Sequence, residues 1–302
     1  MEFRSLKENE LKEWTTFCGS IFPVSEAYFM RHFVNDPYRD INGIFISKDE
    51  TGLTSSVRVF TRYLRIKDSI IKVGGIGEVC TKLTHRGMGL SAKLLSMAID
   101  YMGSNDMVLS MLHTGTNHHY VKQGWFSISS RYKVFRLRKS ELKQGYYAVK
   151  SDPADINLIK KLYEEHAHKL CPVYERNDEY YDKWVRNELT HTYFLIKDNQ
   201  VVSYADCVLR EKQGVVIKEY IGGNEMHMMK PFLYSICKEE KWPKICAVSS
   251  PFTKEKGFIN IYDYGQMFRI NRPFEIAGKP IRYEEDLLPY LSEFPELSID
   301  GY

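Results

Sequence analysis

The stretch that most constrains this sequence runs from Glu78 to Met102, EVCTKLTHRGMGLSAKLLSMAIDYM. It begins with residues typical of a β-strand, passes through a short turn that contains Arg86, Gly87 and Gly89, and ends in a long amphipathic segment. Apolar residues recur on one face of that segment, which predicts a helix after the turn. The first N–H groups of such a helix have no partner within it and can bind an anion. We therefore expect a phosphate group at this turn.

Length and composition predict an ordinary globular protein. The chain has 302 residues, 43% of them hydrophobic, and a formal net charge of only +3 with basic and acidic residues interspersed, which argues against nucleic acid as the main partner. No run of 18 apolar residues occurs and the first residues are charged, so we expect no membrane span and no signal peptide. The six cysteines form no CxxC pair, which favours reduced thiols and a cytoplasmic location.

The elements expected before residue 140 form one mixed domain. The periodicity predicts two helices, in residues 6–23 (LKENELKEWTTFCGSIFP) and around residues 25–36 (SEAYFMRHFVND), followed by an antiparallel meander of three or four strands. The helix after the turn, a short buried strand in DMVLSMLH, a short helix in NHHYVKQGW and a strand in SRYKVFRLRK complete the series. This order predicts an α/β fold with a mixed sheet.

The second half reads as a degraded copy of the first. Amphipathic helices come first, then a strand series punctuated by turns, then a helix in HMMKPFLYSICKEE. The strand-to-helix junction of this half, IGGNEMHMMKP, lacks the basic RGxG turn. We therefore predict two tandem domains, 1–140 and 141–302, of which only the first holds phosphate.

The turn differs from the best-known phosphate-binding motifs. It is neither the dinucleotide fingerprint GxGxxG nor a Walker sequence, because no GK[ST] follows. The arrangement V-C-T-K-L-T-H-R-G-M-G-L, with N-H-H-Y-V-K-Q-G-W roughly 30 residues further on, instead resembles the GNAT superfamily of acetyl-CoA-dependent N-acetyltransferases. The resemblance implies a GNAT fold in the first domain and coenzyme A as the phosphate ligand. The doubled layout is similar to the Eis-type acetyltransferases, without room for their third, sterol-carrier-like domain.

The resemblance also implies roles for particular residues. The pyrophosphate of coenzyme A would be held by the loop residues Arg86, Gly87, Met88, Gly89, Leu90 and Ser91. The backbone of the strand residues Val79, Cys80 and Thr81 would pair with the pantetheine arm. Asn117 and Tyr120 would lie near the thioester, with Tyr120 as the general acid. Ser91 stands where the family prefers Gly or Ala, and it is small enough to keep the loop.

The chemistry of acetyl transfer suggests the acid and the base. A phenol with an ordinary pKa of about 10 is protonated at neutral pH and can donate a proton to the departing sulfur, which suits Tyr120. For the base we nominate Glu78, which we expect at the start of the cofactor strand; a water chain, or the terminal carboxylate at Tyr302, stays open as an alternative. No metal is expected, because acetyl transfer needs none and the adjacent His118 and His119 would point in different directions.

We therefore expect an acyltransferase that moves an acetyl group from acetyl-CoA to a primary amine. The alternative is a non-catalytic acyl-CoA-binding or scaffold protein that keeps the phosphate loop. The sequence leaves open whether the amine belongs to a small molecule or a peptide, whether longer acyl groups are used, and whether the protein forms a homo-oligomer.

Overall fold

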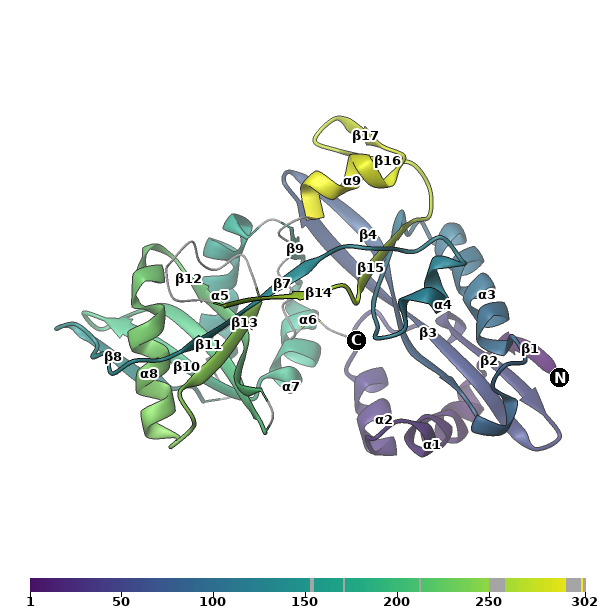
Figure 1. Ribbon diagram of the computed structural model, residues 1–302, viewed down its shortest axis with the longest axis horizontal. Coiled ribbons are helices and arrows are strands. Elements are labelled where there is room, and N and C mark those ends of the chain that lie inside the picture. The colour runs from purple at the N-terminus through teal and green to yellow at the C-terminus, as the bar shows by residue number, and fades with distance from the viewer. Residues whose placement is uncertain (153–154, 171, 212, 250–258, 292–299, 301–302) are drawn as a thin grey trace.

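The protein is described from a computed structural model of the whole chain, in which residues 153–154, 171, 212, 250–258, 292–299 and 301–302 are not described. The chain forms two lobes, each built on one large β-sheet (Figure 1). A two-stranded hairpin and a last helix lie beside the first lobe. These are β16 (Phe274–Ile276), β17 (Lys279–Ile281) and α9 (Glu284–Leu291).

The first sheet carries the strand and turn that the sequence singled out. In spatial order its strands are β1 (Glu2–Ser5), β2 (Ile44–Asp49), β3 (Gly52–Ile66), β4 (Ser69–Thr81), β5 (Leu109–His113), β15 (Gln266–Ile270) and β6 (Phe126–Ser127), with β9 (Val173–Tyr174) paired to β3. The pairs along this order are antiparallel except β4 with β5, which are parallel. The crossover between these two strands contains helix α3 (Leu90–Ser104).

Helices cover both faces of the first sheet, because successive residues of a strand point to opposite faces. In β2, Phe45 packs in the cluster that contains the apolar face of α3. Its neighbours Ile44 and Ile46 pack in the cluster formed by α1 (Leu11–Ile21) and α2 (Glu26–Val34). The continuous apolar run of β2 thus reflects burial on both sides.

The second sheet repeats this plan. Its strands, in spatial order, are β14 (Ile259–Asp263), β7 (Ser130–Arg136), β13 (Ile245–Ser249), β12 (Gly214–Gly222), β11 (Gln200–Arg210), β10 (His191–Lys197) and β8 (Tyr146–Lys150). Its helices are α5 (Ile156–His166), α6 (Asp178–Tyr180), the π-helical turn η6 (Tyr181–Val185), α7 (Arg186–Glu188) and α8 (Met229–Glu239). Strands β12 and β13 are parallel and α8 lies between them in the chain, as α3 lies between β4 and β5. The predicted mixed α/β fold with two similar halves is confirmed.

The two sheets exchange strands. Strand β7 pairs with β13 and β14 in the second sheet, although it precedes residue 140. Strand β15 comes from the second half of the chain and pairs with β5 and β6 in the first sheet. The chain passes from the first sheet to the second between β6 and β7, and back to the first between β14 and β15 (Figure 1). The division of the chain into domains 1–140 and 141–302 stays a prediction.

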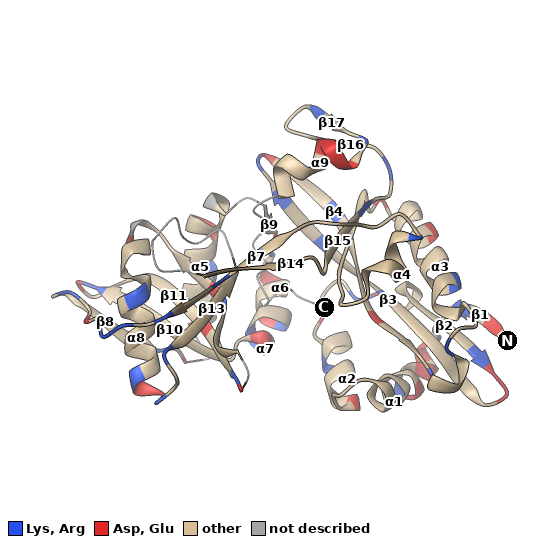
Figure 2. Cartoon of the chain, in the orientation of Figure 1, with Lys and Arg blue, Asp and Glu red and all other residues tan. Residues whose placement is uncertain are grey.

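Charged residues of both signs are spread over both lobes (Figure 2). Within the described residues, every helix is too short or too polar to cross a lipid bilayer.

Candidate active site

The basic turn folds into the start of α3. A short 3₁₀ turn over Leu83–His85 leads from β4 to Arg86. Gly87 and Gly89 have φ angles of 81° and 75°, in the left-handed region that favours glycine. A Cβ atom built on either residue meets nothing within 4 Å, so the backbone angle and not crowding requires glycine here. Gly89 is the N-cap of α3 and, having no side chain, makes no side-chain cap hydrogen bond.

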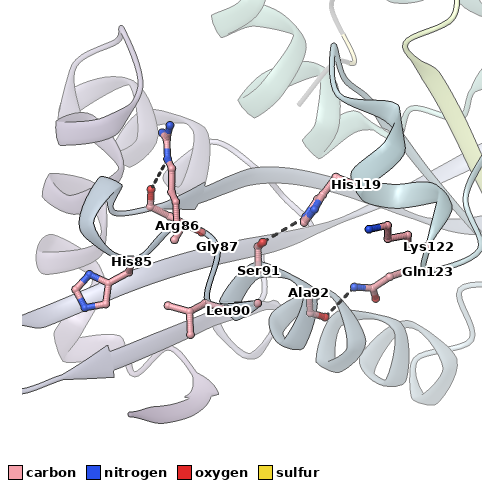
Figure 3. Close-up of a pocket in the computed structure, with 11 residues that line it drawn as sticks. His85, Arg86, Gly87, Leu90, Ser91, Ala92, His119, Lys122 and Gln123 are labelled. Carbon is pink, nitrogen blue, oxygen red and sulfur yellow. Dashed lines mark hydrogen bonds between the residues drawn. The ribbon is translucent and has the colours of Figure 1, made fainter.

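A cavity of 440 Å³ opens at this uncapped end of α3. It is lined by Thr81, by residues 85–87 and 89–92, and by side chains from the segment of α4 (Asn117–Val121) and the turn after it (Figure 3). Arg86 is exposed, and its Nε donates to the carbonyl of Thr81 at 3.4 Å. The N-terminus of a helix carries a partial positive charge and free N–H donors, so this first cavity suits a phosphate.

The opposite wall of the first cavity is tied to α3. The Nε2 atom of His119 lies 3.3 Å from Ser91 Oγ, and Gln123 Nε2 donates to the carbonyl of Ala92 at 2.9 Å (Figure 3). Burial, with the nearby charges of His118 and Lys122, lowers the pKa of His119, which favours a neutral imidazole. The Lys122 side chain also lines the cavity and adds a second cation to its lining.

Strand β4 separates from β5 just before the turn. The two strands pair only over Val73–Gly75 and Leu109–Met111. Further along β4, Glu78 and Val79 face the single residue Val57 of β3, which makes a β-bulge with Glu78 at φ 53°. Within the described residues, the edge of β4 that faces β5 therefore has no strand partner after Gly75. An extended ligand can hydrogen-bond to this edge.

A second cavity of 550 Å³ lies along this unpaired edge. Its walls are residues 79–81 of β4, Ile21 and Phe22 at the end of α1, and Thr116, His118, His119 and Tyr120. It shares Thr81, Arg86, Ser91 and His119 with the first cavity, so the two are adjacent parts of one groove.

Tyr120 is the side chain of α4 that faces this cavity from the protein core. It is 8% exposed, and its ring packs edge-on against Trp125 with the ring centres 6.1 Å apart. Burial raises the pKa of Tyr120 to about 12, so its hydroxyl is protonated at every physiological pH. The structure thus brings Tyr120 into the same groove as Val79, Cys80 and Thr81.

Glu78 is inside β4, at the bulge, and not at the start of the strand as the sequence suggested. The reason is that β4 extends back to Ser69 as the partner of the long β3. The Glu78 side chain is 7% exposed and lies 3.4 Å from the guanidinium of Arg58. Burial raises the pKa of Glu78 to about 7, although Arg58 acts in the opposite direction. Glu78 does not itself line either cavity, but the next residue, Val79, lines the second.

The remaining predicted residues differ in where they point. Leu90 lines the first cavity, whereas Met88 is 60% exposed and lines neither cavity. Asn117 also lines neither cavity: its Nδ2 donates to Ser127 Oγ at 2.7 Å and to the carbonyl of Tyr264. Its amide thus fastens α4 to the point where the chain passes from β14 to β15. Tyr302 lies outside the described residues.

The sequence reasoning missed the charged residues behind the site. Asp36, Arg58 and Arg62 are at most 1% exposed and form a connected group beside Glu78. A signal was present in β3, where the otherwise apolar stretch VRVFTR places two arginines four residues apart, on one face of the strand. Among the described residues, no group of three His, Cys, Asp or Glu side chains could hold a metal ion.

Comparisons with known proteins agree with this geometry. Residues 2–127 match the family model of the acetyltransferase (GNAT) domain. A search of curated proteins finds none that matches the chain.

Solved structures share the fold over most of the chain. A GCN5-related N-acetyltransferase from Anabaena variabilis is 13% identical with a TM-score of 0.70, over 91% of this chain and 76% of that one. A conserved protein from Enterococcus faecalis, named as a probable N-acyltransferase, is 12% identical with a TM-score of 0.71, over 89% and 72%. Eis1 from Mycobacterium abscessus is 10% identical with a TM-score of 0.62, over 90% and 74%. At these identities the likeness concerns the fold alone.

Proposed function

We propose that this chain is an N-acetyltransferase that moves the acetyl group of acetyl-CoA to a primary amine, because residues 2–127 match the family model of the acetyltransferase (GNAT) domain. The acceptor is a small molecule or a peptide. The cysteines at 18, 80, 207, 237 and 246 are free thiols, which suits a reducing compartment, and we place the protein in the cytoplasm.

One observation carries the proposal: the uncapped start of α3 and the unpaired edge of β4 are parts of one groove that ends beside a buried tyrosine. Coenzyme A has a matching order of parts, with a pyrophosphate, an extended amide-containing arm and a thioester. In this arrangement the loop from Arg86 to Ser91 holds the pyrophosphate, and the backbone of Val79–Thr81 pairs with the arm.

Acetyl-CoA supplies an activated acetyl group, which passes to the amine nitrogen as the carbon–sulfur bond breaks. The amine loses one proton and the sulfur gains one, so the residues beside the thioester must manage two proton movements.

Tyr120 occupies the general-acid position. Its pKa of about 12 lies above the ordinary thiol value of about 8.5, so complete proton transfer to the sulfur is uphill by roughly 3 to 4 pKa units. The hydroxyl therefore stabilises the departing sulfur mainly by donating a hydrogen bond. A hydrogen bond to a charged group contributes about 1.5–3 kcal/mol, equivalent to roughly a 10- to 150-fold change in rate.

Glu78 is the base in this proposal. A carboxylate with a pKa of about 7 is half deprotonated at neutral pH and is a much stronger base than an exposed glutamate. Because Glu78 lies behind the cavity wall, the proton of the amine reaches it through water. Oε2 of Glu78 is buried and has no hydrogen-bond partner among the described residues, so it is free to accept that proton.

A thiol-release assay tests the proposal. The full chain is mixed with acetyl-CoA and, one at a time, with a polyamine, an aminoglycoside, an amino acid and a lysine-containing peptide, and free CoA is measured with a thiol reagent. We expect release that depends on one class of amine. Tight binding of acetyl-CoA without amine-dependent release from any member of the panel would favour the non-catalytic acyl-CoA-binding protein.

A further inference from the structure

Buried charged side chains form a connected row that ends at Glu78. The row begins at Arg62, which contacts the second lobe. Arg58 Nη1 lies 3.4 Å from Glu78 Oε1, and Arg58 Nη2 lies 3.3 Å from Asp36 Oδ2. Both oxygens of Asp36 accept from Arg62 Nη1 at 3.1 Å. The side chains of Asp36, Arg58 and Arg62 are each 1% exposed. Charges this deeply buried interact strongly, because little water screens them.

Aromatic rings fix the two arginines. The guanidinium of Arg58 lies 3.9 Å from the ring centre of Phe60 on its own strand. The guanidinium of Arg62 lies 4.5 Å from the ring centre of Trp184, which belongs to η6 of the second lobe. Stacking of this kind restrains an arginine in addition to its ion pairs. The second lobe, which lacks the phosphate turn, therefore contacts the charged row from behind.

The contact between Arg58 and Glu78 is longer than a strong one. Charge-assisted N–H···O pairs are usually about 2.7–2.9 Å long. Arg58 is instead shared between two carboxylates, and the second one, Asp36, is also bonded to Arg62. The two contacts of Arg58 are nearly equal, 3.3 Å to Asp36 and 3.4 Å to Glu78, so Glu78 has one long contact to a cation, and its Oε2 has no hydrogen-bond partner among the described residues.

We propose that Asp36 and Arg58 are positioning residues for Glu78, and that Asp36 withholds Arg58 from a close pair with Glu78 so that this carboxylate can serve as a base. The inference rests on the proposed function in one respect, the assignment of Glu78 as the base. Because Arg62 binds Asp36 and stacks on Trp184, the second lobe also contributes to the positioning of Glu78.

Among the described residues, two uncharged groups also face Glu78. They are Tyr28 on α2 and Cys18 on α1, which both interact with the Glu78 carboxylate. Burial raises the pKa of Tyr28 to about 12, and the neighbouring Cys80, together with burial, raises the pKa of Cys18 well above its ordinary value. Both side chains are neutral at neutral pH, so Arg58 and Asp36 are the charges that act on Glu78.

The arrangement predicts shifts of opposite sign. Arg58→Gln removes a positive charge and raises the pH at which Glu78 titrates. Asp36→Asn removes a negative charge, releases Arg58 toward Glu78 and lowers that pH. An opposite charge within about 4–6 Å shifts a carboxyl pKa by about 1–3 units, so the midpoint should rise by about one unit or more in Arg58→Gln. The weaker effect of Asp36 on Glu78 predicts a smaller downward shift in Asp36→Asn. A purely structural role would not produce two opposite shifts.

Carbon-13 NMR of the full chain with labelled glutamate carboxyls measures the midpoint directly. The signal of Glu78 is the one missing in Glu78→Gln, and it should titrate near pH 7 in the unchanged protein. We expect a higher midpoint in Arg58→Gln, a lower one in Asp36→Asn, and a return toward the original value in Arg58→Lys, which keeps the charge. Shifts in the same direction, or no shift in either variant, would overturn the inference.

A matched control and a second readout complete the test. Asp206 is also fully buried, but it bonds to Thr190 and Thr192 in the second lobe, so Asp206→Asn should leave the Glu78 midpoint unchanged. Thermal unfolding identifies any variant that does not fold. If Asp36→Asn is one, Arg62→Lys is used instead: it loosens the hold of Arg62 on Asp36, which leaves Asp36 freer to draw Arg58 from Glu78 and should raise the Glu78 midpoint. The acid limb of kcat/KM is then compared with each NMR midpoint. If the NMR midpoints move as expected but the acid limb of kcat/KM does not move with them, the positioning of Glu78 by Asp36 and Arg58 stands and Glu78 is not the base.

Discussion

Gly89→Asp tests the phosphate site at its most sensitive point. Gly89 is the N-cap of α3 with φ 75° and ψ 9°; it lines the first cavity, and a Cβ built there meets nothing within 4 Å. Aspartate tolerates left-handed backbone angles better than most residues, and it is a favoured N-cap. The variant should therefore fold, with its carboxylate accepting the helix N–H groups that the phosphate would use.

The loss of affinity can be worked out from this position. Two unit charges about 4 Å apart repel by about 4 kcal/mol at the effective dielectric constant of about 20 found near protein surfaces. That energy corresponds to roughly a 10³-fold weaker Kd. Competition for the N–H donors adds to the loss, whereas the extra carboxylate stabilises the free helix by about 0.3–1 kcal/mol.

Isothermal calorimetry with acetyl-CoA measures the effect. Two controls separate its causes: Gly89→Asn adds nearly the same atoms without the charge, and Gly103→Asp adds the same charge at an exposed site near the other end of α3 where a Cβ meets nothing. We expect a small loss for Gly89→Asn and none for Gly103→Asp. If Gly89→Asp binds acetyl-CoA within threefold of the unchanged protein, the phosphates lie elsewhere and the reasoning is wrong.

Four further outcomes are expected. Tyr120→Phe should lower kcat by about 10- to 10²-fold with little change in acetyl-CoA affinity, and an unchanged kcat from pH 6 to 9 would reduce the tyrosine to a packing residue. Since Glu78 must lose its proton to act as a base, kcat/KM should fall as the pH drops below about 7, and Glu78→Gln should abolish that limb. Calorimetry should find one acetyl-CoA per chain, and two would contradict the proposal that the second half has lost its phosphate site. Arg176→Met leaves the carboxylates of Glu219 and Asp300 buried without their cation, and urea unfolding should report a loss of about 3–5 kcal/mol; a loss below about 1 kcal/mol would show that they do not depend on it.

The elements near the phosphate turn could be predicted because their causes are local. The helix after the turn follows from the spacing of its apolar residues, and it was found at Leu90–Ser104. The positive φ angles of Gly87 and Gly89 are a property of glycine itself. The adjoining strand and the short helix with Tyr120 were predicted for the same reason, and the order of elements indicated two similar halves.

The assignment of strands to sheets could not be predicted. The pattern of SRYKVFRLRK predicts a strand but not its neighbours, and β7 pairs with β13 and β14. The strand around QMFRINRP likewise pairs with β5, which lies far from it in the sequence. A strand forms its hydrogen bonds with another segment, so its place in a sheet depends on how the whole chain packs.

The environment of the candidate base was also decided by the tertiary structure. From the sequence alone, Glu78 is a charged residue near the end of a strand. Only the tertiary packing buries its carboxylate, and this burial raises its pKa to about 7 against the opposing charge of Arg58. In the same way, Asn117 belongs to a predicted motif, yet its amide binds the carbonyl of Tyr264, which comes from the distant crossover between the lobes. Sequence patterns determine which groups are present and the local backbone that carries them. Burial and charge pairing bring together residues far apart in the chain, so only the folded arrangement of the two sheets determines what those groups can do.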